Sequence, residues 1–120
     1  MARDRFPQSV YGTGDEPDAR FTLANERTYL AWIRTSLALL AGGIALEVLG
    51  LGIDEFFRMA ASVVLMGTGI AAAPVAWWGW ARYERALRNN TPLPPSMFAL
   101  PIAAAVAVSG LLVFVGFLLR

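Results

Sequence analysis

The sequence predicts an all-α membrane protein with three transmembrane helices, on three observations. Hydrophobic residues make up 57% of the 120 residues, and the mean hydropathy of +0.52 is too high for an ordinary soluble domain. Residues 59–81 and 97–119 carry no charge, and each is long enough to cross a hydrocarbon core of roughly 30 Å as a helix. A third apolar stretch, residues 30–51, precedes them.

The composition excludes several classes of function. The chain has no His and no Cys, which excludes thiol nucleophiles, the commonest proton shuttle, zinc-finger sites and disulfides. We therefore expect neither an enzyme nor a cofactor or metal site. The net charge of +1 gives no overall basic footprint for nucleic acid. Charge arguments must depend on where the arginines lie.

Residues 1–20 are predicted to be a mobile cytoplasmic tail, and residues 21–120 to be the three-helix transmembrane domain. The tail lacks hydrophobic periodicity and contains Gly12, Gly14 and Pro17. We expect no cleavable signal peptide, because the first apolar run begins only near residue 30. Thr22 is the expected N-cap of a helix that continues into the first span.

The boundaries of the spans follow from local signals. Gly50 and Gly52 can end the first helix and Asp54 can cap the second, so the external turn is short and the two helices are antiparallel. Pro74 is expected to bend the second span. Asn and Pro residues between 89 and 95 predict an extended connector before the third span. Small residues spaced by four, such as Gly67 with Ala71 and Gly69 with Ala73, predict close helix packing.

The arginines predict the orientation. The amino-terminal side and the second loop hold Arg3, Arg5, Arg20, Arg27, Arg82, Arg85 and Arg88, whereas the other side holds only Arg58 and Arg120. By the positive-inside rule the N-terminus is cytoplasmic and the C-terminus lies outside. Six aromatic residues fall at the predicted cytoplasmic interface, where such rings concentrate: Tyr29, Trp32, Trp77, Trp78, Trp80 and Tyr83.

A basic stripe is predicted on the first long helix. Arg20, Arg27 and Arg34 are spaced by seven, so successive side chains drift only about 20° around a helix. Asn25 and Glu26 flank the stripe. Either the charges reach the headgroups by snorkelling, or they face an oligomer axis or a crevice that can hold anions. Two arguments favour the second interpretation. A central charge that faces lipid costs roughly 2.5 to 3.5 kcal/mol, which an axis or crevice would avoid, and guanidinium groups bind phosphate well.

Three further charged features carry expectations. Arg82, Arg85 and Arg88 either anchor the protein to anionic lipid or form a vestibule that gathers anions. Glu84 can pair with Arg88 at i, i+4, and Glu26 with one of these arginines across helices. Glu47 is predicted as an intramembrane carboxylate. It lies about 220° around the helix from Arg34, so the two cannot pair within one helix.

Residues 21–37, and above all the motif Leu-Ala-Asn-Glu-Arg-Thr-Tyr-Leu-Ala-Trp at 23–32, resemble the YidH-like family of small bacterial inner-membrane proteins, a domain of unknown function. The domain also resembles the membrane part of the eukaryotic vacuolar transporter chaperone complex, a polyphosphate polymerase and translocator. This resemblance implies a multi-pass protein of the bacterial inner membrane and a central pore lined by first helices. It places Arg27 at the polyanion, with Asn25 and Glu26 fixing its geometry and Arg34 extending the stripe. The resemblance does not extend to a polymerase domain, so it does not imply polymerase activity.

Three hypotheses follow from these readings. The first is a homo-oligomer, oligomerising through the first helix, with an Arg-lined passage or binding column for inorganic or polymeric anions such as phosphate or polyphosphate. The second is a non-conducting scaffold or accessory subunit of another membrane complex, whose arginines anchor it to membrane lipid. The third is a small proton-coupled transporter that uses Glu47.

Overall fold

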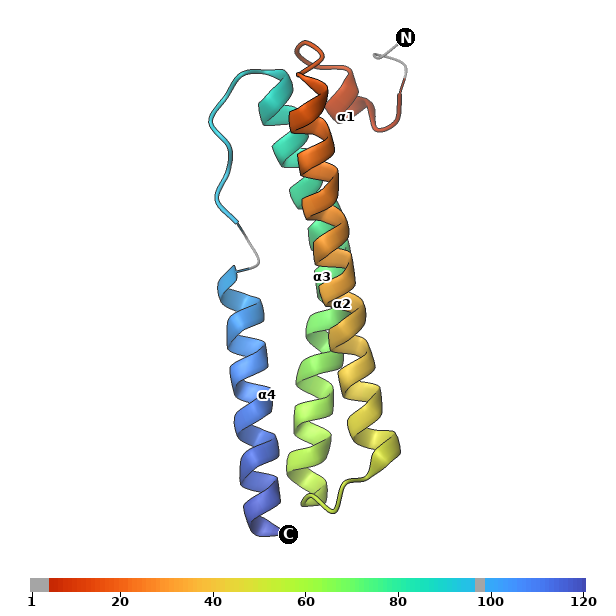
Figure 1. The fold of residues 1–120 in the computed structure, drawn as a ribbon, viewed down its shortest axis with the longest axis vertical. Coiled ribbons are helices and arrows are strands. Elements are labelled where there is room, and N and C mark those ends of the chain that lie inside the picture. Colours follow the sequence, from red (N-terminus) through yellow and green to blue (C-terminus); the bar gives the residue numbers. More distant parts are fainter. Residues whose placement is uncertain (1–4, 97–98) are drawn as a thin grey trace.

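The computed structural model describes residues 5–96 and 99–120. It contains four helices, α1 (Gln8–Tyr11), α2 (Ala19–Leu49), α3 (Glu55–Arg88) and α4 (Ala99–Leu119), and no strand in these two ranges (Figure 1). The helices α2, α3 and α4 are each long and apolar enough to cross a membrane. The expected all-helical fold with three helices of membrane-spanning length is therefore confirmed. The expected start of the third span at Met97 lies outside the described residues.

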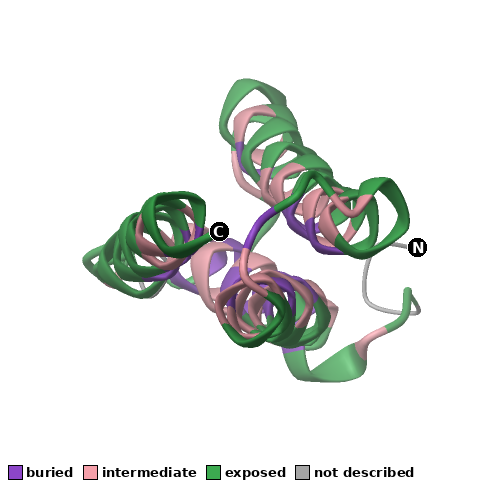
Figure 2. Ribbon diagram, turned by 90° about the horizontal axis from the view of Figure 1, so that it is seen from below, coloured by how far each residue is buried: buried purple, intermediate pink, exposed green. Residues whose placement is uncertain are grey.

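The three long helices form an open row with α3 in the middle. Helix α3 packs against both α2 and α4, whereas no pair of α2 and α4 Cα atoms comes within 8 Å (Figures 1 and 2). The described chain is accordingly elongated, with extents of 59 × 23 × 20 Å. The sides of α2 and α4 that face away from α3 are exposed and rich in large apolar residues, as in helices that contact lipid or further protein.

Small residues allow α2 and α3 to approach closely. A Cβ atom on Gly69 would lie 2.9 Å from the carbonyl oxygen of Ser36, and the Ser36 hydroxyl donates to the carbonyl of Gly69. Gly43 is likewise buried against α3. Gly69 was among the small residues that the sequence singled out, whereas Gly67 has open space where its side chain would be.

The helix ends agree with the sequence in three places and differ in one. Gly50, at φ 69°, follows the last residue of α2, and the Asp54 carboxylate caps α3 by accepting from the amide of Phe57. Helix α3 ends at Arg88, directly before the Asn- and Pro-containing connector. The expected N-cap Thr22 is wrong: Asp18 caps α2 one turn earlier, accepting from the Arg20 amide at 2.8 Å.

The amino-terminal residues pack on the end of α3 that is predicted to face the cytoplasm. Helix α1 contacts α3, and Val10 is fully buried. The ring of Phe6 stacks with Trp77, and the ring of Tyr11 lies beside Trp80. Where the sequence predicts a tail without fixed contacts, the structure places a segment held by α3, and this segment contributes to the polar groups at that end of the bundle.

Candidate functional site

The basic stripe lies on the side of α2 that faces away from α3. Arg20, Arg27 and Arg34 are all exposed. The guanidinium of Arg20 donates to the Asp18 carboxylate at 3.1 and 3.2 Å. Arg27 and Arg34 take part in no hydrogen bond or ion pair with any described residue. The predicted common face is confirmed, and two of its three cations have no partner within the described chain.

A shallow groove of about 370 Å³ follows the lower-numbered half of this stripe. It is lined by Arg20, Leu23, Glu26, Arg27 and Leu30. Glu26 is exposed here and forms no ion pair with a described residue, so the expected pair between Glu26 and an arginine of α3 is wrong. The groove gives α2 an exposed surface on which guanidinium groups and leucine side chains alternate.

Asn25 lies on the opposite side of α2 and belongs to a buried polar cluster with Glu84 of α3. The Asn25 amide donates to the Glu84 carboxylate at 3.2 Å and to the Trp80 carbonyl at 3.1 Å. The Thr22 hydroxyl donates to the second Glu84 oxygen at 2.9 Å. Glu84 is only 1% exposed, and these donors satisfy a carboxylate that would otherwise be costly to bury.

Sequence reasoning missed the role of Glu84. The expected pair between Glu84 and Arg88 is wrong, because Glu84 turns toward α2 while Arg88 turns toward the amino-terminal segment. A signal was present: Glu84 continues, at steps of four, the row of Ala72, Ala76 and Trp80. Residues at that spacing share a helix face, and the two alanines mark the face that α2 covers.

Arg85 and Arg88 hold the amino-terminal segment through hydrogen bonds to its carbonyl groups. Arg88, 3% exposed, donates to the carbonyls of Tyr11 and Thr13 at 3.1 and 2.9 Å and to the Glu16 carboxylate at 3.3 Å. Arg85 donates to the carbonyl of Ser9 at 3.0 Å. Arg82 lines both cavities beside the connector, Arg85 lines one of them, and Arg88 lines neither.

Glu16 is the acidic partner in this contact. The Arg5 guanidinium, hydrogen-bonded to the Glu16 carboxylate, holds the pKa of Glu16 below its ordinary value, and Arg88 lowers it further. The pKa of Asp18 is also lowered, by the hydrogen bonds from the side chain and backbone of Arg20. Both carboxylates therefore remain charged to lower pH than free side chains do.

Glu47 pairs near the opposite end of the bundle. Its carboxylate lies 3.8 Å from the guanidinium of Arg58, which also donates to the carbonyl of Gly50 at 3.3 Å. The expectation that Glu47 and Arg34 do not pair is confirmed, and the partner that Glu47 requires comes from α3. In the described ranges no three acidic residues gather where a metal ion could bind.

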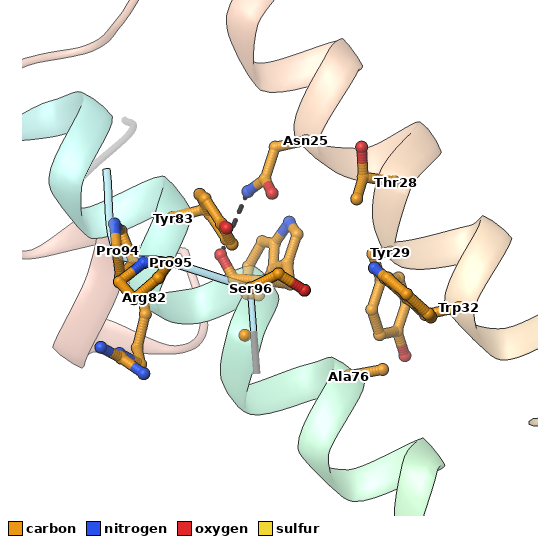
Figure 3. Close-up of a pocket in the computed structure, with 12 residues that line it drawn as sticks. Asn25, Thr28, Tyr29, Trp32, Ala76, Arg82, Tyr83, Pro94, Pro95 and Ser96 are labelled. Atoms are coloured by element: carbon orange, nitrogen blue, oxygen red, sulfur yellow. Dashed lines mark hydrogen bonds between the residues drawn. The ribbon is translucent and has the colours of Figure 1, made fainter. Parts of the chain in front are cut away.

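A cavity of about 160 Å³ lies between α2, α3 and the connector that follows α3 (Figure 3). Tyr29 and Trp32 come from α2, and Trp80 and Tyr83 come from α3. We call it the aromatic cavity. It continues the polar cluster toward the connector, because the side chain of Asn25 belongs to both.

Fold and surface together define a small multi-pass helical membrane protein with one uncovered basic helix face. The chain belongs to the family described as Domain of unknown function (DUF202), whose model matches residues 20–86. The match includes the stripe and Glu84 and ends before Arg88. The family resemblance given by the 23–32 motif is thereby confirmed.

Curated relatives agree with this assignment. The chain is 37% identical over 110 residues to Inner membrane protein YidH of Escherichia coli (strain K12), covering 86% of this chain and 95% of that protein. It is 44% identical over 86 residues to an uncharacterized protein of Mycobacterium tuberculosis (strain ATCC 25618 / H37Rv), covering 68% of each. No solved structure gives a significant match. The protein is a multi-pass protein of the bacterial inner membrane.

Proposed function

We propose that the protein forms a homo-oligomer in which the basic stripe of α2 lines a passage or binding column for inorganic or polymeric anions such as phosphate or polyphosphate. The observation that carries this proposal is the exposure of Arg27 and Arg34 without a partner in the described chain. A guanidinium facing lipid near the middle of a helix costs roughly 2.5 to 3.5 kcal/mol on insertion scales. A water-filled centre shared between copies avoids that cost.

The open row of helices supports self-association through α2. Because α4 packs on α3 and not on α2, nothing within the described chain covers the stripe. Exposed leucines at 23, 30 and 37 have the same seven-residue spacing as the arginines. A second copy would bury these apolar side chains while the neighbouring guanidinium groups remain hydrated, since packing is the main source of association between membrane helices.

The residues have distinct roles in this proposal. Arg20, at the first turn of α2, lies at the mouth of the column, and Arg27 and Arg34 continue it into the membrane. Each guanidinium can bind two phosphate oxygens at once. Glu26 borders the groove and limits how many anions it holds. Asn25 is a positioning residue, because its hydrogen bond to Glu84 fixes the rotation of α2 against α3.

Cysteine crosslinking tests the oligomer directly. The chain contains no Cys, so one introduced thiol reports a single position. We expect Leu30→Cys in native membranes to form a disulfide-linked dimer on mild oxidation, and the matched Leu111→Cys on the exposed side of α4 to form much less. Recovery of Leu30→Cys only in a crosslink to a different protein would instead favour an accessory subunit.

Flux through proteoliposomes tests the passage. We expect the double variant Arg27→Gln, Arg34→Gln to lower phosphate or polyphosphate release at least tenfold, because two charged hydrogen-bonding groups worth about 1.5 to 3 kcal/mol each are lost. Arg120→Gln, at the far end of the chain, is the matched control and should conduct normally. Equal flux through all three proteins would reject the passage. The contact of 3.8 Å between Glu47 and Arg58 favours a structural role for Glu47 over proton coupling.

A further inference from the structure

We propose that the aromatic cavity binds the headgroup of an ethanolamine phospholipid, with the ammonium group inside the cavity and the phosphate at Arg82. This site is separate from the stripe, because it lies where α2 meets α3 and the connector. Its volume of about 160 Å³ is about ten times the roughly 10–15 Å³ that a single water requires. The cavity therefore has room for a small polar group and not only for solvent.

Asn25 gives the cavity a hydrogen-bond acceptor. Asn25 is buried, with 9% of the residue exposed. Its amide nitrogen donates to two acceptors, the Trp80 carbonyl and the Glu84 carboxylate, which fixes the orientation of the amide. Its carbonyl oxygen receives no hydrogen bond from a described residue. Figure 3 draws this side chain at the edge of the cavity, so an occupant that donates a hydrogen bond would satisfy it.

The walls favour a cation at the same place. Tyr29, Trp32 and Tyr83 surround the space in Figure 3, and Trp80 also lines it. Faces of aromatic rings attract ammonium groups, and Trp does so best. The Glu84 carboxylate, which accepts from the Asn25 amide nitrogen at 3.2 Å, adds negative charge next to Asn25. An ammonium group that carries N–H donors matches both the rings and the carbonyl oxygen.

Arg82 supplies the complementary charge at the rim. It lines the aromatic cavity and also an adjoining groove of about 310 Å³, which includes Arg85 and Asn89. Guanidinium groups bind phosphate through paired hydrogen bonds. The acceptor among aromatic rings thus fits an ammonium group, and the neighbouring cation fits a phosphate. A phosphoethanolamine group carries an ammonium and a phosphate at this short separation.

The position in the chain indicates a lipid and not a soluble compound. Arg82 is the first charged residue after the uncharged run 59–81, so it lies at the predicted boundary between hydrocarbon and headgroups. The connector with Pro94 and Pro95 borders the cavity on the side away from α2 and α3. The acyl chains of a lipid held at Arg82 can therefore run down the exposed side of the bundle.

Native mass spectrometry of the full chain released from nanodiscs tests the proposal. The nanodiscs contain equal amounts of ethanolamine, glycerol and choline phospholipids with identical acyl chains. We expect the ethanolamine lipid to be retained about tenfold more than the choline lipid, which has no N–H donor, as the loss of one charge-assisted hydrogen bond implies. Equal retention of all three lipids, or preference for the anionic glycerol lipid, would overturn the proposal.

Paired variants locate the site. We expect Arg82→Gln and Trp32→Ala each to reduce retention of the ethanolamine lipid to the level of the choline lipid. The matched controls are Arg34→Gln on the stripe and Trp78→Ala, which is 62% exposed and does not line the cavity. Retention that survives both cavity variants, or that the controls reduce equally, would show that the lipid binds elsewhere. The lipid preference of the unmodified chain tests the chemistry even where a variant folds poorly.

Discussion

The two sides of α2 differ in how their polar groups are satisfied. On the side facing α3, Asn25 and Ser36 are buried and hydrogen-bonded to groups of α3. On the outer side, Arg27 and Arg34 are exposed and have no partner among the described residues. The inner side therefore fixes the fold, whereas the outer side is available for an anion or another subunit. Substitutions on the two sides should separate stability from function.

The largest expected effect is on the inner side, at Glu84. Glu84→Leu removes the acceptor of the Thr22 hydroxyl and of one Asn25 donor, leaving buried polar groups unsatisfied. We expect the free energy of unfolding to fall by about 3 kcal/mol, measured by denaturant titration in detergent micelles. Glu26 is the matched carboxylate on the outer side, and Glu26→Gln should change the free energy of unfolding by less than about 0.5 kcal/mol. Similar losses in both variants would contradict the division between the two sides.

An intermediate effect is expected where α3 meets the amino-terminal segment. Arg88→Met keeps most of the side-chain volume but removes the donors to Tyr11, Thr13 and Glu16. We expect the contact to weaken by about 2 kcal/mol, with faster tryptic cleavage after Arg5 or Arg20 and little change in global unfolding. Arg34→Met serves as the control. A cleavage rate unchanged from the unmodified chain would show that Arg88 does not hold the segment.

The sequence predicts the number of long helices and most of their ends well. The length of an apolar run, and the Gly, Asp, Asn and Pro residues at its ends, are local properties of the sequence. Four features follow from short runs of residues, without knowledge of the segments that pack against them. They are the three spans, the helix end before Gly50, the Asp54 cap and the connector after Arg88. The common face of Arg27 and Arg34 follows equally from helical spacing.

Partners across helices could not be predicted in the same way. Glu84 has Arg88 four residues away, a pairing that favours an isolated helix, but burial against α2 offers Thr22 and Asn25 instead. Arg88 then bonds carbonyl groups of the amino-terminal segment, which have no signature in the sequence because every residue has a carbonyl. The partners of both Glu84 and Arg88 therefore depend on packing between segments that are distant in the sequence.

The smallest expected effect is a pH dependence of the amino-terminal contact. The folded-state pKa of Glu16 lies below its ordinary value of 4.5, because Arg5 and then Arg88 stabilise the carboxylate. A carboxyl group with a lowered pKa stabilises the folded form above its unfolded-state pKa, and this contribution is lost as the pH falls through the lowered value. Hydrogen exchange of residues 8–16 should thus show weaker protection as the pH falls below the ordinary value of 4.5, after correction for the intrinsic exchange rate, and Glu16→Gln should remove this dependence. The same dependence in the variant would assign it to Asp18, whose pKa is also lowered, and would place the pH-sensitive contact at the start of α2.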